Sequence, residues 1–307
     1  MPYLKPMQEK YYFGIDLGGT KVEGVVLDAQ YGELARYRVP TERERGYAHI
    51  VSRVGLVVAE LERQTGLAAR HVGIGTPGTI DPPTGLLKNA NTVVLNGKPL
   101  AADLEIELDC SVTLANDANC LAVAEAVLGC VPKHAPRARV VFGVILGTGV
   151  GGGIVVDGKV LGGAQGIGGE WGHMFLDHTA GYCYCGRVGC VERLISGPAL
   201  ERYYAGLTGA ERGLAAIAER SRAGGDVAAG RTMDRLLHYF AKGIANVINV
   251  LDPDVVVLGG GVGNLDELYT ESMRERVAAH LFNPRMDTVF LRPELGDSGG
   301  VYGAAVL

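Results

Sequence analysis

Two aspartates, Asp16 and Asp117, lie near the ends of predicted strands, where their carboxylates could act on a bound substrate. Asp16 ends a short β-prone run and is followed at once by Gly18-Gly19-Thr20-Lys21. A carboxylate there could hold Mg²⁺ against phosphate oxygens, or it could cap the N–H groups of the turn. Asn116-Asp117 lies between a predicted strand and a predicted helix. Asp117 is therefore either the N-cap of that helix or a general base that accepts the proton of an attacking hydroxyl group.

Three glycine-rich turns could bring backbone N–H groups close to an anion, because glycine has no Cβ to hold a ligand away. They are Gly18-Gly19-Thr20, Gly147-Thr148-Gly149 and Gly259-Gly260-Gly261. An ordinary hairpin explains either of the first two turns alone just as well. Neither has the spacing of a Walker P-loop or of the dinucleotide-binding motif that opens a helix. Three such turns after buried strands are typical of a nucleotide held at its phosphates and base.

One histidine and three cysteines form a cluster with the composition of a zinc site. The cluster comprises His173, Cys183, Cys185 and Cys190. Three thiolates and one imidazole make the closed set of four ligands expected for structural Zn²⁺, and Gly186 and Gly189 let the chain turn tightly enough for the sulfurs to converge. A redox pair is the alternative, but the spacing is not C-x-x-C and one cysteine would be unexplained. The remaining cysteines, Cys110, Cys120 and Cys130, are interpreted as small core residues.

The elements that must position these residues follow the same order in both halves of the chain. In each half a strand, a glycine turn and a second strand succeed one another, which predicts an α/β fold of two related lobes facing a cleft. The composition of residues 131–137 is that of a surface loop, so we expect an N-terminal lobe over residues 1–130 and a C-terminal lobe over 131–295. The predicted strands are 11–15, 22–28, 71–75, 111–115, 140–146, 154–157 and 255–258. One predicted helix begins at residue 50, and two others span 118–128 and 233–251.

Composition and charge exclude several classes of protein. The chain has 307 residues, 46 of them glycine, and 47% of its residues are hydrophobic, so a disordered linker is excluded. A net charge of −5 without a basic stripe argues against nucleic-acid binding. The sequence has no signal-peptide core and no run of about 18 apolar residues. We therefore expect a cytoplasmic protein with no membrane partner.

Together these motifs resemble the ROK family (repressors, open reading frames, kinases) of sugar kinases and sugar-responsive regulators. Asp16-Leu17-Gly18-Gly19-Thr20-Lys21 and Leu146-Gly147-Thr148-Gly149-Val150-Gly151-Gly152 resemble its two phosphate motifs. Glu170-Trp171-Gly172-His173, followed by Cys183-Tyr184-Cys185-Gly186-Arg187-Val188-Gly189-Cys190-Val191-Glu192, resembles its zinc signature. The resemblance runs from residue 12 to Ala305. It implies a two-lobed actin-like ATPase fold with a zinc-binding loop, residues from about 296 to 307 packing back on the first lobe, and homodimers.

The resemblance also implies a role for each matching residue. Asp117 corresponds to the catalytic base, and the sugar-binding positions correspond to Asn116, Glu170, His173 and Glu192. Two loops correspond to the lining of the sugar pocket, Gly75-Thr76-Pro77-Gly78 and Asn89-Ala90-Asn91. Asp16, Lys21 and the three glycine turns would bind the nucleotide, with ATP, Mg²⁺ and structural Zn²⁺ as the cofactors. His173 would then serve both the zinc and the sugar.

The predicted function is transfer of the γ-phosphate of ATP to the 6-hydroxyl group of a hexose. Lys88-Asn89-Ala90-Asn91 and Cys183-Tyr184-Cys185-Gly186 are most similar to bacterial manno(fructo)kinases, so fructose or mannose is the first expectation. Gly97-Lys98-Pro99-Leu100 and Gly172-His173-Met174 are similar to N-acetylglucosamine kinases, so that activity or a glucokinase is the alternative. A sugar-responsive repressor is disfavoured, because the first strand begins near Tyr11 and leaves no room for a helix-turn-helix. Filled catalytic positions likewise disfavour a non-catalytic sugar-binding scaffold.

Overall fold

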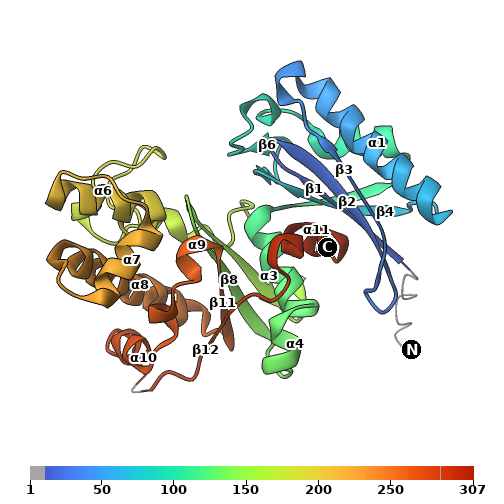
Figure 1. Ribbon diagram of the computed structural model, residues 1–307. Coiled ribbons are helices and arrows are strands. Elements are labelled where there is room, and N and C mark those ends of the chain that lie inside the picture. The colour runs from blue at the N-terminus through green and yellow to red at the C-terminus, as the bar shows by residue number, and fades with distance from the viewer. Residues whose placement is uncertain (1–10, 284) are drawn as a thin grey trace. The chain divides into compact units, whose positions relative to one another are not determined.

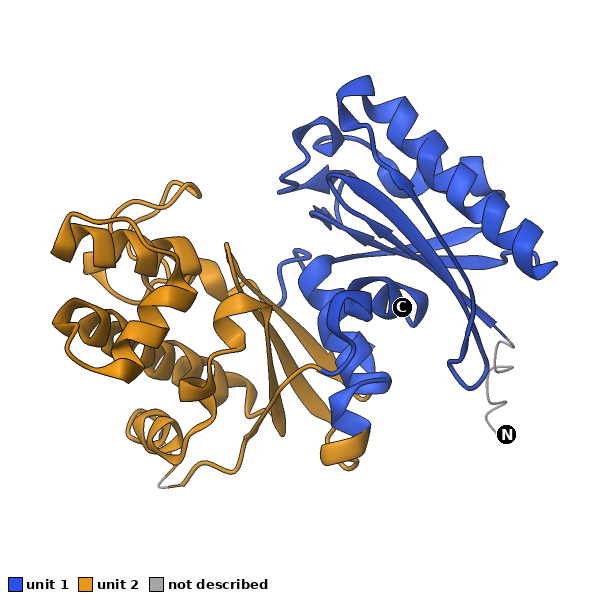
Figure 2. Cartoon of the chain, in the orientation of Figure 1, with its two compact units in different colours: residues 1–132, 158–168, 294–307 blue, residues 133–157, 169–293 orange. Residues whose placement is uncertain are grey.

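Two five-stranded sheets organise the described part of the chain, which divides into two units (Figures 1 and 2). The computed structural model describes residues 11–283 and 285–307. Unit 1 comprises Met1–Pro132, Gly158–Gly168 and Glu294–Leu307, and unit 2 comprises Lys133–Asp157 and Gly169–Pro293. The sequence-based division at 130 and 295 differs from these units mainly at residues 158–168, which group with unit 1 although they lie within the second half of the chain.

The sheet of unit 1 starts with an antiparallel hairpin and continues with parallel strands. Its order is β3-β2-β1-β4-β7, in which β1 pairs antiparallel with β2 and parallel with β4, and β4 pairs parallel with β7. The strands are β1 (Tyr11–Leu17), β2 (Lys21–Asp28), β3 (Glu33–Pro40), β4 (His71–Thr76) and β7 (Ser111–Asn116), beside a separate pair of β5 (Thr79–Ile80) and β6 (Leu87–Lys88). The parallel strands therefore end at one common edge of the sheet.

Helices cover both faces of this sheet because its strands are buried on both sides. Val22 and Val26 point to the face covered by the apolar stripe of α1, and Val25 and Leu27 point to the opposite face, where α11 packs (Figure 1). Successive side chains of a strand alternate between the two faces, so one strand supplies both cores. The helices are α1 (Tyr47–Thr65), α2 (Leu100–Leu108), α3 (Asp117–Val127) and α11 (Gly299–Ala305).

Glycines allow α11 to lie unusually close to its neighbours. A Cβ on Gly73 of β4 would lie 1.8 Å from the Ala304 carbonyl oxygen, and one on Gly303 would lie 1.9 Å from the carbonyl oxygen of Cys120 in α3. Such distances exclude any side chain at either position. Part of the glycine excess therefore serves helix packing, a use that differs from the approach to phosphates and metal that the glycine turns indicate.

The second sheet repeats the hairpin and the parallel strands, and its strands lie in unit 2 except for β10, whose residues group with unit 1. Its order is β10-β9-β8-β11-β12, with β8 antiparallel to β9 and parallel to β11, and with β11 parallel to β12. The repeated strand, glycine turn and strand predicted from the sequence are thus present in both halves. The strands are β8 (Val140–Leu146), β9 (Val150–Val156), β10 (Lys159–Val160), β11 (Val255–Gly259) and β12 (Val289–Leu291).

The core of unit 2 is formed between its sheet and a group of helices (Figure 1). Trp171 lies at its centre and makes edge-to-face contacts with Phe142 of β8 and Phe240, at 6.0 and 6.5 Å between ring centroids. The longest helix, α8, starts at the N-cap Asp226 and ends before Asp252. The helices are α5 (Glu192–Ile195), α6 (Gly197–Thr208), α7 (Leu214–Ala223), α8 (Val227–Leu251), α9 (Gly260–Gly263) and α10 (Glu271–Ala278).

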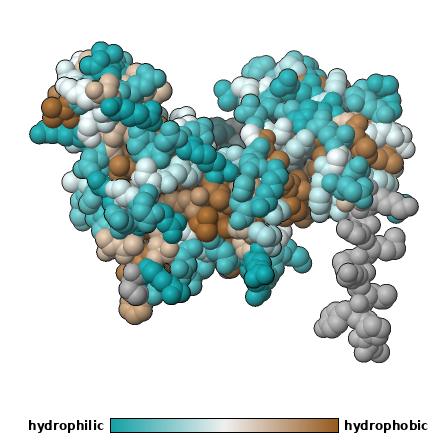
Figure 3. Space-filling model, turned by 60° about the horizontal axis from the view of Figure 1, so that its bottom comes forward, coloured by the Kyte–Doolittle hydropathy of each residue, from teal (hydrophilic) through white to brown (hydrophobic). Residues whose placement is uncertain are grey.

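The expectation of a surface loop over residues 131–137 is wrong in its first half. A short helix, α4 (Cys130–His134), occupies this stretch, and its first two residues, Cys130 and Val131, are buried. Among the described residues no helix is long and apolar enough to cross a membrane. Hydrophilic side chains cover most of the face in Figure 3, and apolar ones gather in smaller areas.

Candidate active site

The residues of unit 1 that were predicted to do chemistry lie at the edge where its parallel strands end. In the register of β1, β4 and β7, Asp16 pairs with Gly75 and Thr76 pairs with Asn116. Asp117 follows directly as the first residue of α3. Three strands and one helix of unit 1 thus bring the predicted carboxylates and the first predicted sugar loop to one edge of the sheet.

Asn116, and not Asp117, is the N-cap of α3. The Asn116 side-chain oxygen Oδ1 accepts a hydrogen bond from the Asn119 N–H at 2.8 Å, whereas Asp117 Oδ1 accepts from the adjacent Ala118 N–H at 2.8 Å. The interpretation of Asp117 as the cap is therefore wrong. Burial raises the pKa of Asp117, although the Ala118 N–H partly offsets this effect. A raised pKa brings the carboxylate closer to the range in which a general base works at neutral pH.

Asp16, a partly buried residue, brings a second carboxylate to this edge. Burial raises the pKa of Asp16, Lys21 lowers it, and the negative charges of Glu23 and Asp117 raise it further. The donor chemistry suits Mg²⁺, which binds proteins through one or two carboxylates and takes its other ligands from phosphate and water. Asp16 therefore fits the Mg²⁺ role that its position near the end of β1 predicted.

The first glycine turn is held in shape by a residue that the sequence analysis did not single out. Gly18 N–H donates to the Lys21 carbonyl at 2.9 Å, which closes the turn. The Thr41 hydroxyl donates to the Gly18 carbonyl at 2.7 Å, and the Thr41 N–H donates to the Thr20 carbonyl at 3.0 Å. Thr41 is completely buried. It lies 23 residues beyond Gly18, so no local pattern could have revealed this contact.

The two predicted sugar loops of unit 1 touch each other. A Cβ on Gly78 would lie 2.6 Å from the Lys88 carbonyl oxygen, so only glycine permits this approach. The side chain of Asn96 accepts from the Ala90 N–H at 2.8 Å and donates to the Ala90 carbonyl at 2.9 Å. Asn96 therefore fixes the loop that carries Asn89 and Asn91, and it is a second supporting residue that the sequence analysis missed.

In unit 2 the second and third glycine turns follow neighbouring parallel strands. Gly259, the last residue of β11, pairs with Ile145 near the end of β8. A cavity of about 550 Å³ opens beside the turns. Gly147, Thr148 and Gly261 line it, together with residues that the sequence analysis did not predict: Gly197, Pro198, Glu201, Gly213, Leu214, Ala215, Val262 and Leu265. A lining of glycine backbone together with aliphatic side chains suits the phosphates and base of a nucleotide.

The four predicted zinc ligands of unit 2 converge. Their donor atoms all lie within 4.8 Å of one another. The Sγ atoms of Cys185 and Cys190 are 3.6 Å apart, and Cys183 Sγ is 3.7 Å from His173 Nδ1. A tetrahedral zinc ion bound through such donors separates them by about 3.5–3.8 Å, so the residues fit the ion. Positive φ angles of 84° and 91° at Gly186 and Gly189 allow the loop to fold this way.

The residues of unit 2 that are predicted to bind sugar lie within the cluster or close to its members in sequence. His173 uses Nδ1 toward the cysteines, and its Nε2 lies 3.1 Å from the Tyr184 hydroxyl. Glu192 is buried and accepts the Val150 N–H through Oε2 at 3.0 Å. Glu192 therefore reaches from the zinc-binding segment to the end of the second glycine turn. Glu170 directly precedes the 3₁₀ turn Trp171–His173.

Comparisons with known proteins identify the chain. The model of the ROK family matches residues 12–307. The chain belongs to the ROK family. An N-acetyl-D-glucosamine kinase of Vibrio cholerae is 37% identical over 96% of this chain and 99% of that protein, and one of Aliivibrio salmonicida is 36% identical over the same shares.

Solved structures of ROK proteins agree with this assignment. A ROK hexokinase from Thermus thermophilus has a TM-score of 0.84 and 34% identity over 96% of this chain and 97% of its own. A ROK glucokinase from Streptomyces griseus, solved with glucose and AMPPNP, has a TM-score of 0.71 and 29% identity over 96% and 98%. The chain is thus an ATP-dependent hexose kinase of the ROK family with the actin-like ATPase fold. A ROK transcriptional regulator at 20% identity shares the fold alone.

Gly260 of this ROK kinase cannot carry a side chain. Its φ is +83°, and a Cβ would lie 2.3 Å from the Leu146 carbonyl oxygen. We expect Gly260→Ala to destabilise unit 2 by about 2–4 kcal/mol through backbone strain and overpacking, measured as a lower denaturation midpoint. Gly261→Ala is the matched control, because that position opens onto free space without a positive φ. Equal midpoints for the two variants would contradict this account of the third turn.

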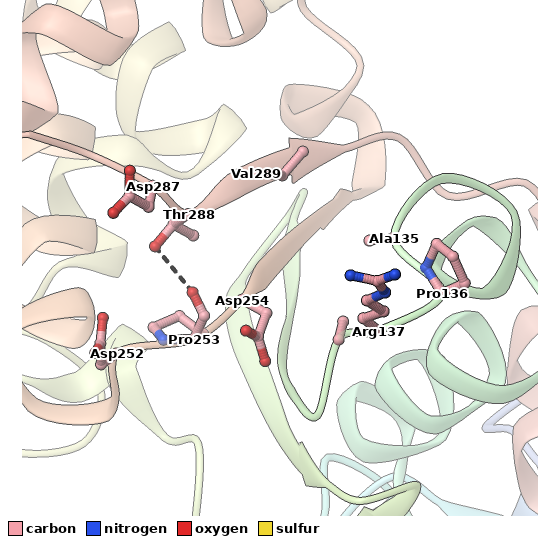
Figure 4. Close-up of a pocket in the computed structure, with 10 residues that line it drawn as sticks. Ala135, Pro136, Arg137, Asp252, Pro253, Asp254, Asp287, Thr288 and Val289 are labelled. Carbon is pink, nitrogen blue, oxygen red and sulfur yellow. Dashed lines mark hydrogen bonds between the residues drawn. The ribbon is translucent and has the colours of Figure 1, made fainter.

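A second cavity of unit 2 lies at the opposite ends of the strands (Figure 4). It has a volume of about 630 Å³ and is lined by residues that precede β8, β11 and β12, among them Arg137 and Asp254. One Asp254 oxygen accepts the N–H groups of Arg139 and Val140, at 2.8 and 2.9 Å. No predicted site residue of the ROK kinase lies there, and the role of Asp254 is to hold the start of β8.

Proposed function

We propose that this kinase transfers the γ-phosphate of ATP to the 6-hydroxyl group of N-acetyl-D-glucosamine. Relatives with that name are more than one-third identical over nearly the whole chain. They favour the alternative of the sequence analysis over its first expectation, fructose or mannose. The motifs Gly97-Lys98-Pro99-Leu100 and Gly172-His173-Met174 point the same way.

The observation that carries the catalytic assignment is the position of Asp117. Because Asn116 caps α3, the Asp117 carboxylate is not needed to hold the helix start. In the proposed reaction Asp117 accepts the proton of the 6-hydroxyl group as the sugar oxygen forms its bond to the γ-phosphorus. The bond from that phosphorus to the bridging oxygen breaks, and ADP leaves with the bond electrons.

The remaining residues of unit 1 are proposed to bind and orient the substrates. Asp16 would hold Mg²⁺, which when bound supplies positive charge to the phosphate oxygens. The N–H groups of Gly18-Gly19-Thr20 and the Lys21 ammonium group would contact phosphate. Thr76, Asn89 and Asn91 would face the sugar, with Asn96 keeping their loop in place through Ala90.

In unit 2 the proposed roles divide between the two substrates. Gly147-Thr148-Gly149 would contact phosphate and Gly259-Gly260-Gly261 the adenosine, beside the cavity that Leu214 and Val262 line. Glu170, His173 and Glu192 would hydrogen-bond the sugar, and His173 would join the three cysteines on structural zinc. That zinc has four protein ligands, so it would shape the loop and leave no position for activating water.

The test is a coupled ADP-release assay with N-acetyl-D-glucosamine, glucose, mannose and fructose. We expect kcat/KM to be at least about tenfold higher for N-acetyl-D-glucosamine, because a pocket that pairs with the acetamido group leaves its polar groups unpaired when that group is missing. A higher value for fructose or mannose would restore the first expectation of the sequence analysis. The homodimer implied by the family resemblance is a separate proposal, which the molar mass from light scattering would test.

A further inference from the structure

Glu125 is a buried carboxylate that the proposed mechanism does not use. It lies on α3, two helical turns after Asp117, and its exposed fraction is 0%. A carboxylate out of contact with water is tolerated only when hydrogen bonds satisfy its oxygens. The partners of Glu125 are therefore the clue to what it does.

Both oxygens of Glu125 accept hydrogen bonds from backbone N–H groups. Oε2 accepts from Cys130 at 2.9 Å, and Oε1 accepts from Glu294 at 2.9 Å and from Leu295 at 2.8 Å. Bonds to a charged acceptor are stronger than those between neutral groups. A Cβ on Gly129 would lie 1.9 Å from Oε2, so the chain also keeps this space clear for the carboxylate.

The three donors stand beside the first and the last passage of the chain between its units. The chain leaves unit 1 after Pro132, two residues beyond Cys130, and it finally returns to unit 1 at Glu294. All of these hydrogen bonds lie within unit 1. Two further passages, at either end of Gly158–Gly168, do not involve Glu125. One side chain thus ties together two segments that are about 165 residues apart in sequence.

We propose that Glu125 is the anchor of a hinge, because it fixes the first and the last connection between the units to α3. When substrates bind, unit 2 rotates about the residues of these two connections that lie just beyond the anchored amides. Hinge motion is absorbed by a few residues at the ends of elements, and Pro132 and Pro293, with their fixed φ, stand at the two passages. Two connections held by one carboxylate cannot shift independently. Glu125 is therefore a positioning residue for the kinase reaction, which needs closure to exclude water.

The decisive variant is Glu125→Gln, examined in the full chain. Glutamine keeps the volume but has one acceptor oxygen, so it cannot serve both connections. We expect the fall in radius of gyration on adding AMPPNP and N-acetyl-D-glucosamine, or whichever panel sugar is turned over fastest, to be less than half that of the wild type. We expect kcat to fall about tenfold, because closure no longer brings the reacting groups to one fixed geometry, while both KM values change less.

Ile50→Val is the matched control, because it lowers the stability of unit 1 through a small cavity in α1 without touching either connection. It should compact and turn over like the wild type. Equal compaction in Glu125→Gln and wild type, or no compaction in the wild type, would overturn the proposal. Because the compaction is measured with whichever sugar is active, failure of the proposed substrate would leave this test intact.

Hydrogen exchange of the wild type provides a test that needs no folded variant. The amides of Cys130, Glu294 and Leu295 should stay protected with and without the two substrates, whereas exchange over residues 133–137 should change when they bind. Exchange of the three amides at the rate of an open loop would show that Glu125 does not hold the connections, and the hinge anchor would be rejected.

Discussion

Replacing Asp117 by asparagine is expected to lower kcat by about 10²–10⁴-fold, the usual effect of losing a general base. The amide oxygen can still accept the Ala118 N–H, which the carboxylate accepts at 2.8 Å, so α3 should start as before. Burial raises the pKa of Asp117 in the folded chain, so the ionised carboxylate opposes folding at neutral pH. The neutral variant should therefore have an equal or higher Tm. Steady-state kinetics and thermal denaturation measure the two effects.

Asp109→Asn is the matched control for this substitution. Asp109 is exposed after α2 and has a φ of 49°, which asparagine also adopts readily, so turnover should be unchanged. In the wild type, kcat/KM should fall as the pH falls through the raised pKa of the base. The acid limb should therefore lie above the ordinary aspartate value of 3.8. Turnover of Asp117→Asn within about twofold of wild type would remove Asp117 from the mechanism.

The parts of the site that could be predicted from sequence are those set by short stretches of chain. Asp16 and the first glycine turn lie within six residues, and the histidine and cysteines of the zinc cluster within eighteen. In such segments the residue types and the spacing alone limit the geometry. The alternation of strands and glycine turns was local in the same way, and it predicted both hairpins and the α/β class.

What could not be predicted depends on contacts between distant segments. Thr41 reaches the turn at Gly18, and Glu192 reaches Val150 across 42 residues. Even one residue can decide a role, since Asn116 and Asp117 are both good N-caps and only the backbone at the end of β7 selects Asn116. The close packing of α11 likewise depends on Gly73 of β4, which carries no local signal. The preferred hexose could not be predicted for the same reason, because it depends on pocket atoms from several loops.

The contact between Glu192 and Val150 connects the segment of the predicted zinc ligands with the second glycine turn. The chain runs from Cys190 through α5, where Glu192 accepts the Val150 N–H, to Gly197, whose N–H donates to the Gly147 carbonyl at 2.9 Å. Both ends of the second glycine turn are thus held by residues that follow a zinc ligand within seven positions. The sequence analysis connected the zinc loop with the sugar pocket only.

Cys185→Ser is therefore expected to release zinc and to raise the KM for ATP as well as the KM for the sugar, each by about tenfold or more, as for other changes that disturb the support of a metal site. The sugar KM should rise further, because His173 would lose its fixed orientation. Elemental analysis measures the zinc, and Cys110→Ser, at a half-buried cysteine outside the cluster, should keep both the metal and the activity.

Glu192→Ala tests the contact between Glu192 and Val150 separately from the metal. It should keep zinc bound and still raise the KM for ATP, because the Val150 N–H loses its 3.0 Å hydrogen bond. Cys185→Ser removes a zinc ligand, so it should raise the KM for ATP in the same way and also release the metal. If Cys185→Ser loses zinc and keeps the wild-type KM for ATP, the zinc cluster does not support the second glycine turn. Glu192 would then hold that turn independently of the metal.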